Sequence, residues 1–449
     1  MAARNKLAIT GGRVIDPAQG IDRIADVLIS NGKIEQVTGM SNGKTPDDYE
    51  RIDASGLIVS PGFVDLHTHL RDPGQEWKET IATGTQAAAR GGFTTVCAMP
   101  NTDPVQDTAS VIDDVMRRAE ADGVVRVLPI GAISVGQKGK RLAPMGELAD
   151  AGVIGFSDDG NPVSDANLMR QALAYSVDLG LPIINHAEDK QLVAGGLMNA
   201  GPVATRLGLA GVAAEAETTM VTRDLQLAEL TGARLHIPHI STIGSITALR
   251  SAKERGINAT AEVTPHHLTL TDEWVYGQQG EVPESVGPGS YDTNTKVNPP
   301  LRSRADVEAL IEALAEGLID VIATDHAPHA ATDKICTYNE AAHGINVLET
   351  AFSSIFTLVD LDSAGLSLVR LIESLTAGPA AILGRDLGTL NNGFSADVTL
   401  IDPEMKWTVD PEELASKSVN TPLAGIELTG RVVATIYRGM TVFDLRAHG

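Results

Sequence analysis

The stretch His67-Thr68-His69 contains the first residues whose types and spacing could support chemistry. Successive side chains of a β-strand point to opposite faces, so His67 and His69 would point to the same side of an extended chain. Two imidazoles on one side are the arrangement that two ligands of one metal ion require. Two ordinary polar histidines would have the same spacing, so this pair alone does not establish a metal site.

Further potential metal ligands stand at the ends of apolar runs elsewhere in the chain. They are Asp158, Asp159, His186, His239 and Asp325. Taken singly, His186 or His239 can also be a hydrogen-bonded core residue, and Asp325 can cap a helix. Histidines and aspartates that all follow apolar runs are hard to explain as separate accidents. Together they predict a metal centre, provided that these runs are strands whose ends meet.

The middle of the chain has the pattern needed to bring these ends together. Strand-like apolar runs alternate with Ala- and Leu-rich helical stretches, which is typical of repeated βα units and a parallel sheet. Such runs begin near residues 63, 94, 125, 152, 181, 234, 258 and 320. Eight units predict an α/β fold of the (β/α)8 TIM barrel type, with the active site at the carboxyl ends of the strands. An open doubly wound sheet is the alternative, but it would need a Gly-rich phosphate turn after the first strand, and HTHLRDPG is not one.

Two β-rich segments flank this middle region. Residues 1–60 contain short alternating runs with Asn31-Gly32 as a hairpin signal, and residues 386–449 again alternate strand formers with turn residues. Because chain ends often lie close together, both segments are expected to form one small β-sandwich domain. The predicted domains are therefore a barrel over residues 61–385 and a sandwich built from both ends.

Composition and charge limit the classes of partner and the compartment. The 449 residues are 43% hydrophobic and 21% charged, as in globular proteins, with a formal net charge of −23 and a pI of about 4.8. Such a surface repels nucleic acid and anionic membranes, so an anionic substrate would need a local positive site. Cys97 and Cys336 cannot form a disulfide framework; we interpret them as a small buried residue and a loop thiol. No secretion signal or membrane-spanning run is present, so a reducing cytoplasm is expected.

Several sequence blocks resemble the dihydroorotase family of the amidohydrolase superfamily, in that family's order and over nearly the whole chain. They are PGFVDLHTHLRDPG, AMPNT, GFSDDG, NHAED, HIST, TPHHL, NPPLR and ATDHAPH. The resemblance implies two metal ions per chain. One ion would be bound by His67, His69 and Asp325, the other by His186 and His239, with Asp159 bridging both.

The bridging residue and the metal follow from the same resemblance. Many relatives bridge with a carboxylated lysine, but residues 150–159 contain no lysine, which indicates the bacterial class with an aspartate bridge. Asp158 is the rival of Asp159, although strand alternation aims it to the opposite face. Imidazole and carboxylate ligands make zinc the first choice, with cobalt or manganese able to substitute. Two divalent ions with two carboxylates and a hydroxide leave a small positive charge that suits an anionic substrate.

The resemblance also implies residues that bind substrate. Arg71, Asn101 and His329 are expected to bind the carboxylate of dihydroorotate. Each also has a structural explanation: an ion pair of Arg71 with Asp72, a turn at Asn101, and a loop position for His329. Further substrate-binding candidates are Asn298, His343 and Gly344, while His236, His266 and His267 are interpreted as structural neighbours.

The dipeptide His343-Gly344 ends a long connection, residues 330–344, where the family commonly has an aromatic residue before the glycine. This connection is predicted either as a lid over the site or as a solvated surface loop.

The reaction implied is the reversible hydrolysis of L-dihydroorotate to N-carbamoyl-L-aspartate in pyrimidine (UMP) biosynthesis. A metal-bridging hydroxide would attack the polarised carbonyl, and Asp325 would carry the proton to the leaving nitrogen as general base and acid. The alternatives are another cyclic amidase, such as a hydantoinase or allantoinase, and an inactive barrel that serves as a partner of aspartate transcarbamoylase. An active enzyme could also form a homodimer or associate with aspartate transcarbamoylase.

Overall fold

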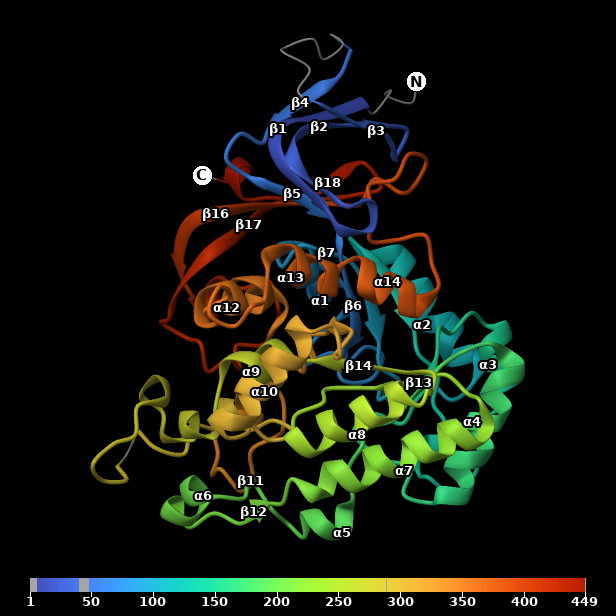
Figure 1. Ribbon diagram of the computed structural model, residues 1–449, viewed down its shortest axis with the longest axis vertical. Helices are drawn as coiled ribbons and strands as arrows, with labels where there is room; N and C mark the ends of the chain where they lie inside the picture. The colour runs from blue at the N-terminus through green and yellow to red at the C-terminus, as the bar shows by residue number, and fades with distance from the viewer. Residues whose placement is uncertain (1–5, 40–47, 288, 449) are drawn as a thin grey trace.

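The computed structural model describes residues 6–39, 48–287 and 289–448, which form a barrel and a β-rich part above it (Figure 1). The barrel strands are β6 (Phe63–Thr68), β7 (Phe93–Ala98), β8 (Arg126–Pro129), β9 (Phe156–Ser157), β10 (Ile183–Ile184), β13 (Leu235–Ile237), β14 (Ala259–Val263) and β15 (Val321–Ile322). Each lies in or beside a run that the sequence pattern predicted as a strand.

The strands close into a ring. One parallel sheet has the order β6-β7-β8 and the other the order β15-β14-β13-β10-β9. Parallel bridges from Gly131 to Phe156 and from Thr68 to His326 join the two sheets at both edges. A closed parallel ring is the predicted TIM barrel, and it excludes the open doubly wound sheet.

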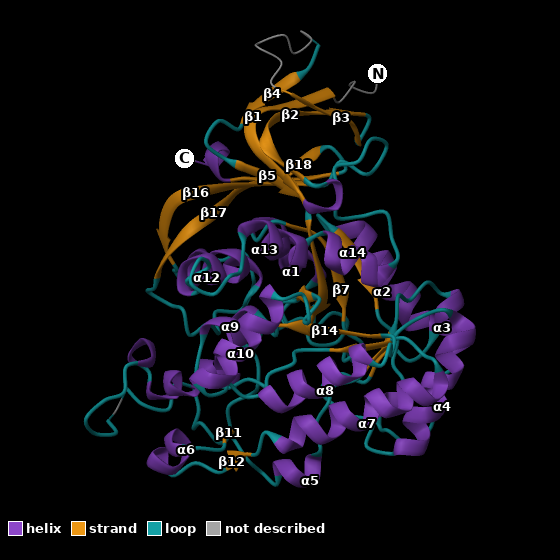
Figure 2. Cartoon of the chain, in the orientation of Figure 1, coloured by secondary structure: helices purple, strands orange, loops and turns teal. Residues whose placement is uncertain are grey.

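Helices surround the barrel (Figure 2). They are α1 (Ile81–Arg90), α2 (Ala109–Asp122), α3 (Met145–Asp150), α4 (Ala166–Leu179), α7 (Glu215–Thr231), α8 (Ile243–Glu254), α10 (Arg304–Ala315), α12 (Ala351–Leu358), α13 (Leu368–Leu375) and α14 (Ala377–Leu383). Several begin where a short polar side chain accepts a first-turn N–H, at Thr80, Asp165, Thr242, Ser303 and Ser367. Each of these caps marks the residue at which a loop ends and a helix begins. Within the described ranges, no helix combines the length and apolar character needed to cross a bilayer.

The inside of the barrel is a separate apolar cluster that includes Val64, Cys97, Leu128 and Ile184. Cys97 is buried there and Cys336 is exposed, as predicted.

The two chain ends build one sheet. Its strands are β1 (Lys6–Asp16), β2 (Ile21–Ser30), β3 (Lys33–Gly39), β4 (Glu50–Asp53), β5 (Ile58–Pro61), β16 (Val398–Thr408), β17 (Glu427–Tyr437) and β18 (Met440–Asp444). Strand β5 joins the halves because it pairs with β1 on one side and with β16 on the other. Apolar residues of both halves, such as Val27 and Ile436, share one core, so the sheet folds over its own inner face as a sandwich.

The predicted hairpin is present in this sheet. Asn31 (φ 53°) and Gly32 (φ 75°) form the turn between β2 and β3. The predicted boundaries of the domains stay a prediction, and residues 1–5 and 40–47 of the first segment lie outside the described residues.

Short elements follow three of the barrel strands, β10, β14 and β15. They are α5 (Lys190–Val193), β11 (Met198–Asn199), α6 (Pro202–Leu207), β12 (Gly211–Val212), α9 (Pro265–Thr269) and α11 (Ala331–Lys334). The connection 330–344 packs here, since Tyr338 joins a buried cluster with Met198 and Tyr276. Buried anchors such as Tyr338 alternate with exposed residues such as Ile335, so both predictions for this connection, a lid and a solvated loop, stay predictions.

Candidate metal centre

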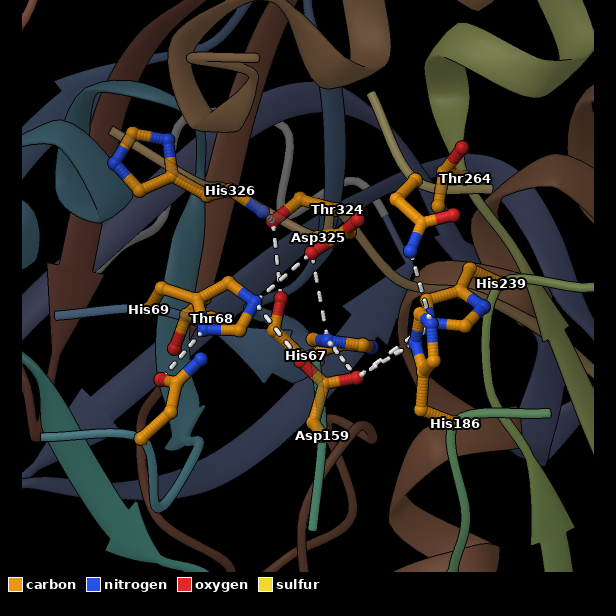
Figure 3. A network of polar contacts seen from close by, with 12 residues as sticks. His67, Thr68, His69, Asp159, His186, His239, Thr264, Thr324, Asp325 and His326 are labelled. Atoms are coloured by element: carbon orange, nitrogen blue, oxygen red, sulfur yellow. Dashed lines mark hydrogen bonds and ion pairs between the residues drawn. The ribbon is translucent and has the colours of Figure 1, made fainter. Parts of the chain in front are cut away.

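Six predicted ligand side chains gather at the carboxyl ends of barrel strands (Figure 3). His67 lies in β6, and the others lie one to three residues beyond the ends of β6, β9, β10, β13 and β15: His69, Asp159, His186, His239 and Asp325. None of the six is more than 4% exposed. Strand ends that are far apart in the chain thus bring imidazoles and carboxylates into one buried cluster.

The first group consists of His67, His69 and Asp325. Asp325 Oδ1 lies 3.0 Å from His69 Nε2 and 3.4 Å from His67 Nε2. The ligand atoms of these three residues all lie within 4.8 Å of one another, close enough to hold one ion. Asn101 orients the His69 ring through its other nitrogen, because His69 Nδ1 lies 2.9 Å from Asn101 Oδ1.

The second group consists of His186 and His239, whose Nδ1 and Nε2 atoms lie 2.8 Å apart. Asp159 Oδ1 is 3.5 Å from each of these atoms. The same carboxylate also approaches the first group, with Oδ2 3.4 Å from His69 Nε2. Asp159 therefore lies between the two groups, in the position that a bridging ligand would need.

Asp158 points elsewhere. Its carboxylate accepts N–H groups from Ile133 at 2.9 Å and Ser134 at 3.0 Å, and it also contacts the Ser134 hydroxyl. These contacts are on the side of β8, away from the six clustered side chains. The alternation of the strand end separates the two aspartates, as the sequence pattern predicted.

The cluster fits divalent metal ions. His67 Nε2 and Asp159 Oδ1 are buried without a hydrogen-bond partner among the described residues, an arrangement that is costly unless something else satisfies these atoms. Burial opposes ionisation of Asp159 and Asp325, yet His67 and its neighbours lower the pKa of both carboxyls below the usual range. Ionised carboxylates among imidazoles are a suitable donor set for zinc or a similar ion.

Three site residues have a backbone conformation that residues other than glycine rarely adopt. The φ angle is 62° at Arg71, 35° at His239 and 47° at Asp325. Such a residue costs about 1–3 kcal/mol and persists where its surroundings hold it. Beside Asp325, the Asp65 carboxylate accepts the Thr324 N–H at 2.9 Å. The extended conformation of β6 does not continue through Arg71, because the chain turns there.

Arg71 nevertheless lies at the mouth of the barrel. Its Nε donates to Pro328 O at 3.2 Å, and its Nη2 lies 3.4 Å from His329 Nε2. Burial lowers the pKa of Arg71 to about 10, so the guanidinium stays charged at neutral pH. Asp72 pairs with Arg118 at 2.9 Å, so the ion pair considered for Arg71 and Asp72 is not the one that forms.

The remaining candidates lie around the same opening. Asn298 Nδ2 donates to Glu188 Oε1 at 2.9 Å and lies 3.2 Å from His186 Nε2. His343 and Asn298 line one cavity of about 300 Å³. At Gly344, where φ is 149°, a Cβ would lie 2.5 Å from Ala327 O and 2.9 Å from His329 Cδ2. Close packing against Ala327 and His329 therefore explains the glycine.

Comparison with known proteins gives the same family as the sequence blocks. A family profile described as Dihydro-orotase-like matches residues 56–245. The protein named Dihydroorotase from Anaeromyxobacter dehalogenans strain 2CP-1 is 51% identical over 438 residues, 98% of each chain. The Dihydroorotase of Geobacter metallireducens is 48% identical over 97% of this chain and 99% of its own. The chain belongs to the dihydroorotase family.

Solved structures support the fold of this dihydroorotase family member. The L-hydantoinase (dihydropyrimidinase) of Arthrobacter aurescens has a TM-score of 0.83 at 26% identity, over 98% of this chain and 96% of that one. A D-hydantoinase has the same TM-score of 0.83 at 22% identity, over 98% and 95%, which shows the fold alone. The predicted barrel with a β-sandwich and the predicted class, a metal-dependent cyclic amide hydrolase, are confirmed.

Sequence reasoning missed Glu262, which lies in β14. Its Oε1 is 2.6 Å from His67 Nδ1, and its Oε2 is 2.9 Å from His236 Nε2. Burial disfavours its charged form, but the contacts with His67 and His236 outweigh burial and lower the pKa of Glu262 to about 2. One signal was available: Glu262 is the single charged residue inside the run ATAEV, which is otherwise suited to a buried strand.

The histidines predicted as structural neighbours lie outside the six-residue cluster. His236 contacts Glu262 and Thr260. His267 lies 2.7 Å from Thr264 Oγ1 and 3.1 Å from Pro299 O, so hydrogen bonds account for both ring nitrogens. The ring nitrogens of His266 are buried without a partner among the described residues.

Proposed function

We propose that the chain catalyses the reversible hydrolysis of L-dihydroorotate to N-carbamoyl-L-aspartate, which closes the pyrimidine ring when it runs backwards. The observation that carries this proposal is the buried cluster around Asp159 beside the charged, buried Arg71. The cluster suits hydrolysis of a cyclic amide, and Arg71 suits a substrate that carries a carboxylate. Relatives named Dihydroorotase over nearly the full length support the same reaction.

In this proposal His67, His69 and Asp325 would hold one divalent ion, His186 and His239 would hold another, and Asp159 would be shared by both. Zinc is the first choice for both. When bound, such ions polarise a carbonyl and acidify a water molecule.

The chain's own residues bind the substrate and move the proton. Arg71, with Asn101 and His329 beside it, holds the carboxylate through charge-assisted hydrogen bonds. Asp325 accepts a proton from the attacking water and delivers it to the ring nitrogen that leaves. The buried walls of the site exclude other water molecules, which strengthens these polar contacts. Asn298, His343 and Gly344 complete the opening through which the ring enters.

Turnover of three substrates tests the proposed function. We expect purified, metal-loaded protein to hydrolyse dihydroorotate far faster than hydantoin or allantoin, because only dihydroorotate offers a carboxylate to Arg71. Faster hydrolysis of either other ring would assign the chain to a different cyclic amidase. A metal-loaded protein that acts on none of the three would favour the inactive partner of aspartate transcarbamoylase.

We expect two metal ions per chain at full activity, because the six ligand side chains divide into two groups that share Asp159. Elemental analysis during reconstitution of metal-free protein measures this number. Activity that reaches its maximum at one ion per chain and gains nothing from further metal contradicts the binuclear centre.

The connection 330–344 is tied to a neighbouring segment by a buried lysine. Lys334 Nζ donates to Ala342 O at 2.7 Å, Thr293 O at 3.1 Å and Lys296 O at 3.2 Å. Burial lowers the pKa of Lys334 from 10.5 to about 7. Lys334 therefore ties this connection to the chain segment that leads to Asn298.

The lowered pKa predicts how stability depends on pH. Between pH 7 and 10.5 the unfolded chain binds one more proton at Lys334 than the folded chain. Stability from this group therefore rises with pH across that window, by at most about 1.4 kcal/mol per unit. We expect the difference in thermal midpoint between wild type and Lys334→Met to change in favour of wild type from pH 7 to 9. The exposed Lys138→Met is the control, and a difference that stays constant with pH contradicts the prediction.

The partners and the compartment are further proposals. A cytoplasmic location, a homodimer and association with aspartate transcarbamoylase follow from the sequence and the family resemblance. Size-exclusion chromatography with and without aspartate transcarbamoylase tests the two assemblies.

A further inference from the structure

One buried carboxylate contacts the proposed ligands of both ions. Glu262 is 0% exposed. Its Oε1 lies 2.6 Å from His67 Nδ1 and accepts the backbone N–H of His239 at 3.3 Å. The other oxygen, Oε2, lies 2.9 Å from His236 Nε2, which holds the carboxylate from its far side.

The contact with His67 determines which nitrogen of that ring faces the cluster. An ionised carboxylate can only accept a hydrogen bond, so His67 Nδ1 carries the proton that it donates to Glu262. The Nε2 atom then has a free lone pair. That atom faces Asp325 Oδ1 at 3.4 Å and Asp159 Oδ1 at 3.6 Å. Glu262 thus selects the ring form of His67 that can bind an ion.

Glu262 also contacts His239, which belongs to the second ligand group. The backbone of His239 has a φ of 35°, a conformation that its surroundings must hold. Glu262 accepts the N–H of this same residue, so it anchors the turn that aims the His239 ring at Asp159. A single side chain thereby fixes one ligand of each group.

We propose that Glu262 is a positioning residue that holds the two ion sites at a fixed separation; this proposal rests on the binuclear centre proposed above. Glu262 also adds a third negative charge to those of Asp159 and Asp325. The loaded centre is then closer to neutral than the six ligands alone would make it, so Arg71 becomes the main cation for an anionic substrate.

The variant Glu262→Gln removes the charge, and because an amide can donate as well as accept, it no longer enforces the ring form of His67. Its amide oxygen can accept from His67 Nδ1, while its NH2 group can donate to His236 Nε2. His236 can then donate from Nδ1 to Thr260 Oγ1, which lies 2.8 Å away. All hydrogen bonds have a substitute, so the fold is expected to survive. The matched control is Glu217→Gln: Glu217 is 4% exposed and accepts N–H groups of Ser241 and Thr242, outside the six ligands.

Titration of metal-free protein with Co²⁺, followed by its visible spectrum and by calorimetry, tests the proposal without any substrate. We expect Glu262→Gln to bind Co²⁺ about 10- to 100-fold more weakly at both sites, with an altered spectrum. Glu217→Gln should bind within about twofold of wild type, since it leaves both ligand groups untouched. Wild-type affinity and an unchanged spectrum in folded Glu262→Gln would overturn the proposal.

A second variant covers the case in which Glu262→Gln does not fold. His236→Asn removes the side chain that holds Glu262 from behind, and we expect a smaller loss of Co²⁺ affinity, about threefold to tenfold. Unchanged affinity in that variant would equally overturn the proposal. Wild-type protein that binds two Co²⁺ ions but does not turn over dihydroorotate would remove the proposed function and leave the role of Glu262 intact. Normal turnover of dihydroorotate by wild type, with unaltered Co²⁺ binding by Glu262→Gln, would remove only the role of Glu262.

Discussion

Asp325→Asn should reduce turnover of dihydroorotate by about 10²- to 10⁴-fold while both metal ions stay bound. Asparagine keeps the shape of Asp325 and offers one oxygen to a metal, but it cannot accept a proton. Asp325 Oδ1 lies 3.0 Å from His69 Nε2, at the centre of the first ligand group. The loss should be equal for ring opening and ring closure, because both directions pass through one transition state.

Steady-state rates in both directions, combined with elemental analysis, measure this effect. The control is Asp272→Asn, since Asp272 is buried and accepts from Asn199 Nδ2 at 2.9 Å, away from the six ligands. It should keep turnover close to that of wild type. If Asp325→Asn holds both ions and remains near-normal in turnover, a histidine of the mouth must move the proton. Asp158 is not a substitute, because its carboxylate faces Ile133 and Ser134.

Arg71→Ala should lower kcat/KM for dihydroorotate by the loss of a charge-assisted bidentate contact, about 2–4 kcal/mol or roughly 30- to 900-fold. Most of the loss should appear in KM, because the guanidinium holds a carboxylate away from the bond that breaks. Arg71→Lys should recover only part of it, since an ammonium keeps the charge but not the planar fork.

Initial-rate kinetics with dihydroorotate and with dihydrouracil, which lacks the carboxylate, measure this effect. Any residual activity on dihydrouracil should be the same in wild type and Arg71→Ala. Arg126→Ala is the control, because Arg126 begins β8 at the opposite end of the barrel and pairs with Asp397 at 3.0 Å. Normal kcat/KM for dihydroorotate in Arg71→Ala would mean that another group binds the carboxylate.

The positions of the ligands could be read from the sequence because each ligand stands at or near the end of an apolar run. His186 follows LPIIN and His239 follows RLHIP, so each strand and its polar end are close together in the sequence. The barrel then brings all such ends to one face, whatever their separation in the chain. Strand alternation also separated Asp158 from Asp159, since it depends only on neighbouring residues.

Tertiary structure decided what no local pattern contains. Glu262 meets His67 across 195 positions of sequence, and nothing near either residue indicates that contact. The turns at Arg71, His239 and Asp325 break strand periodicity, and contacts such as that of Asp65 with Thr324 brace the backbone beside them. Within the segment 330–344, Lys334 reaches the carbonyls of Thr293 and Lys296 and ties this partly exposed segment to a distant part of the chain. The alternation of side chains along a strand determines which side of that strand a residue occupies. The orientation of a ligand side chain depends instead on hydrogen bonds from distant segments, and these form only when the barrel closes.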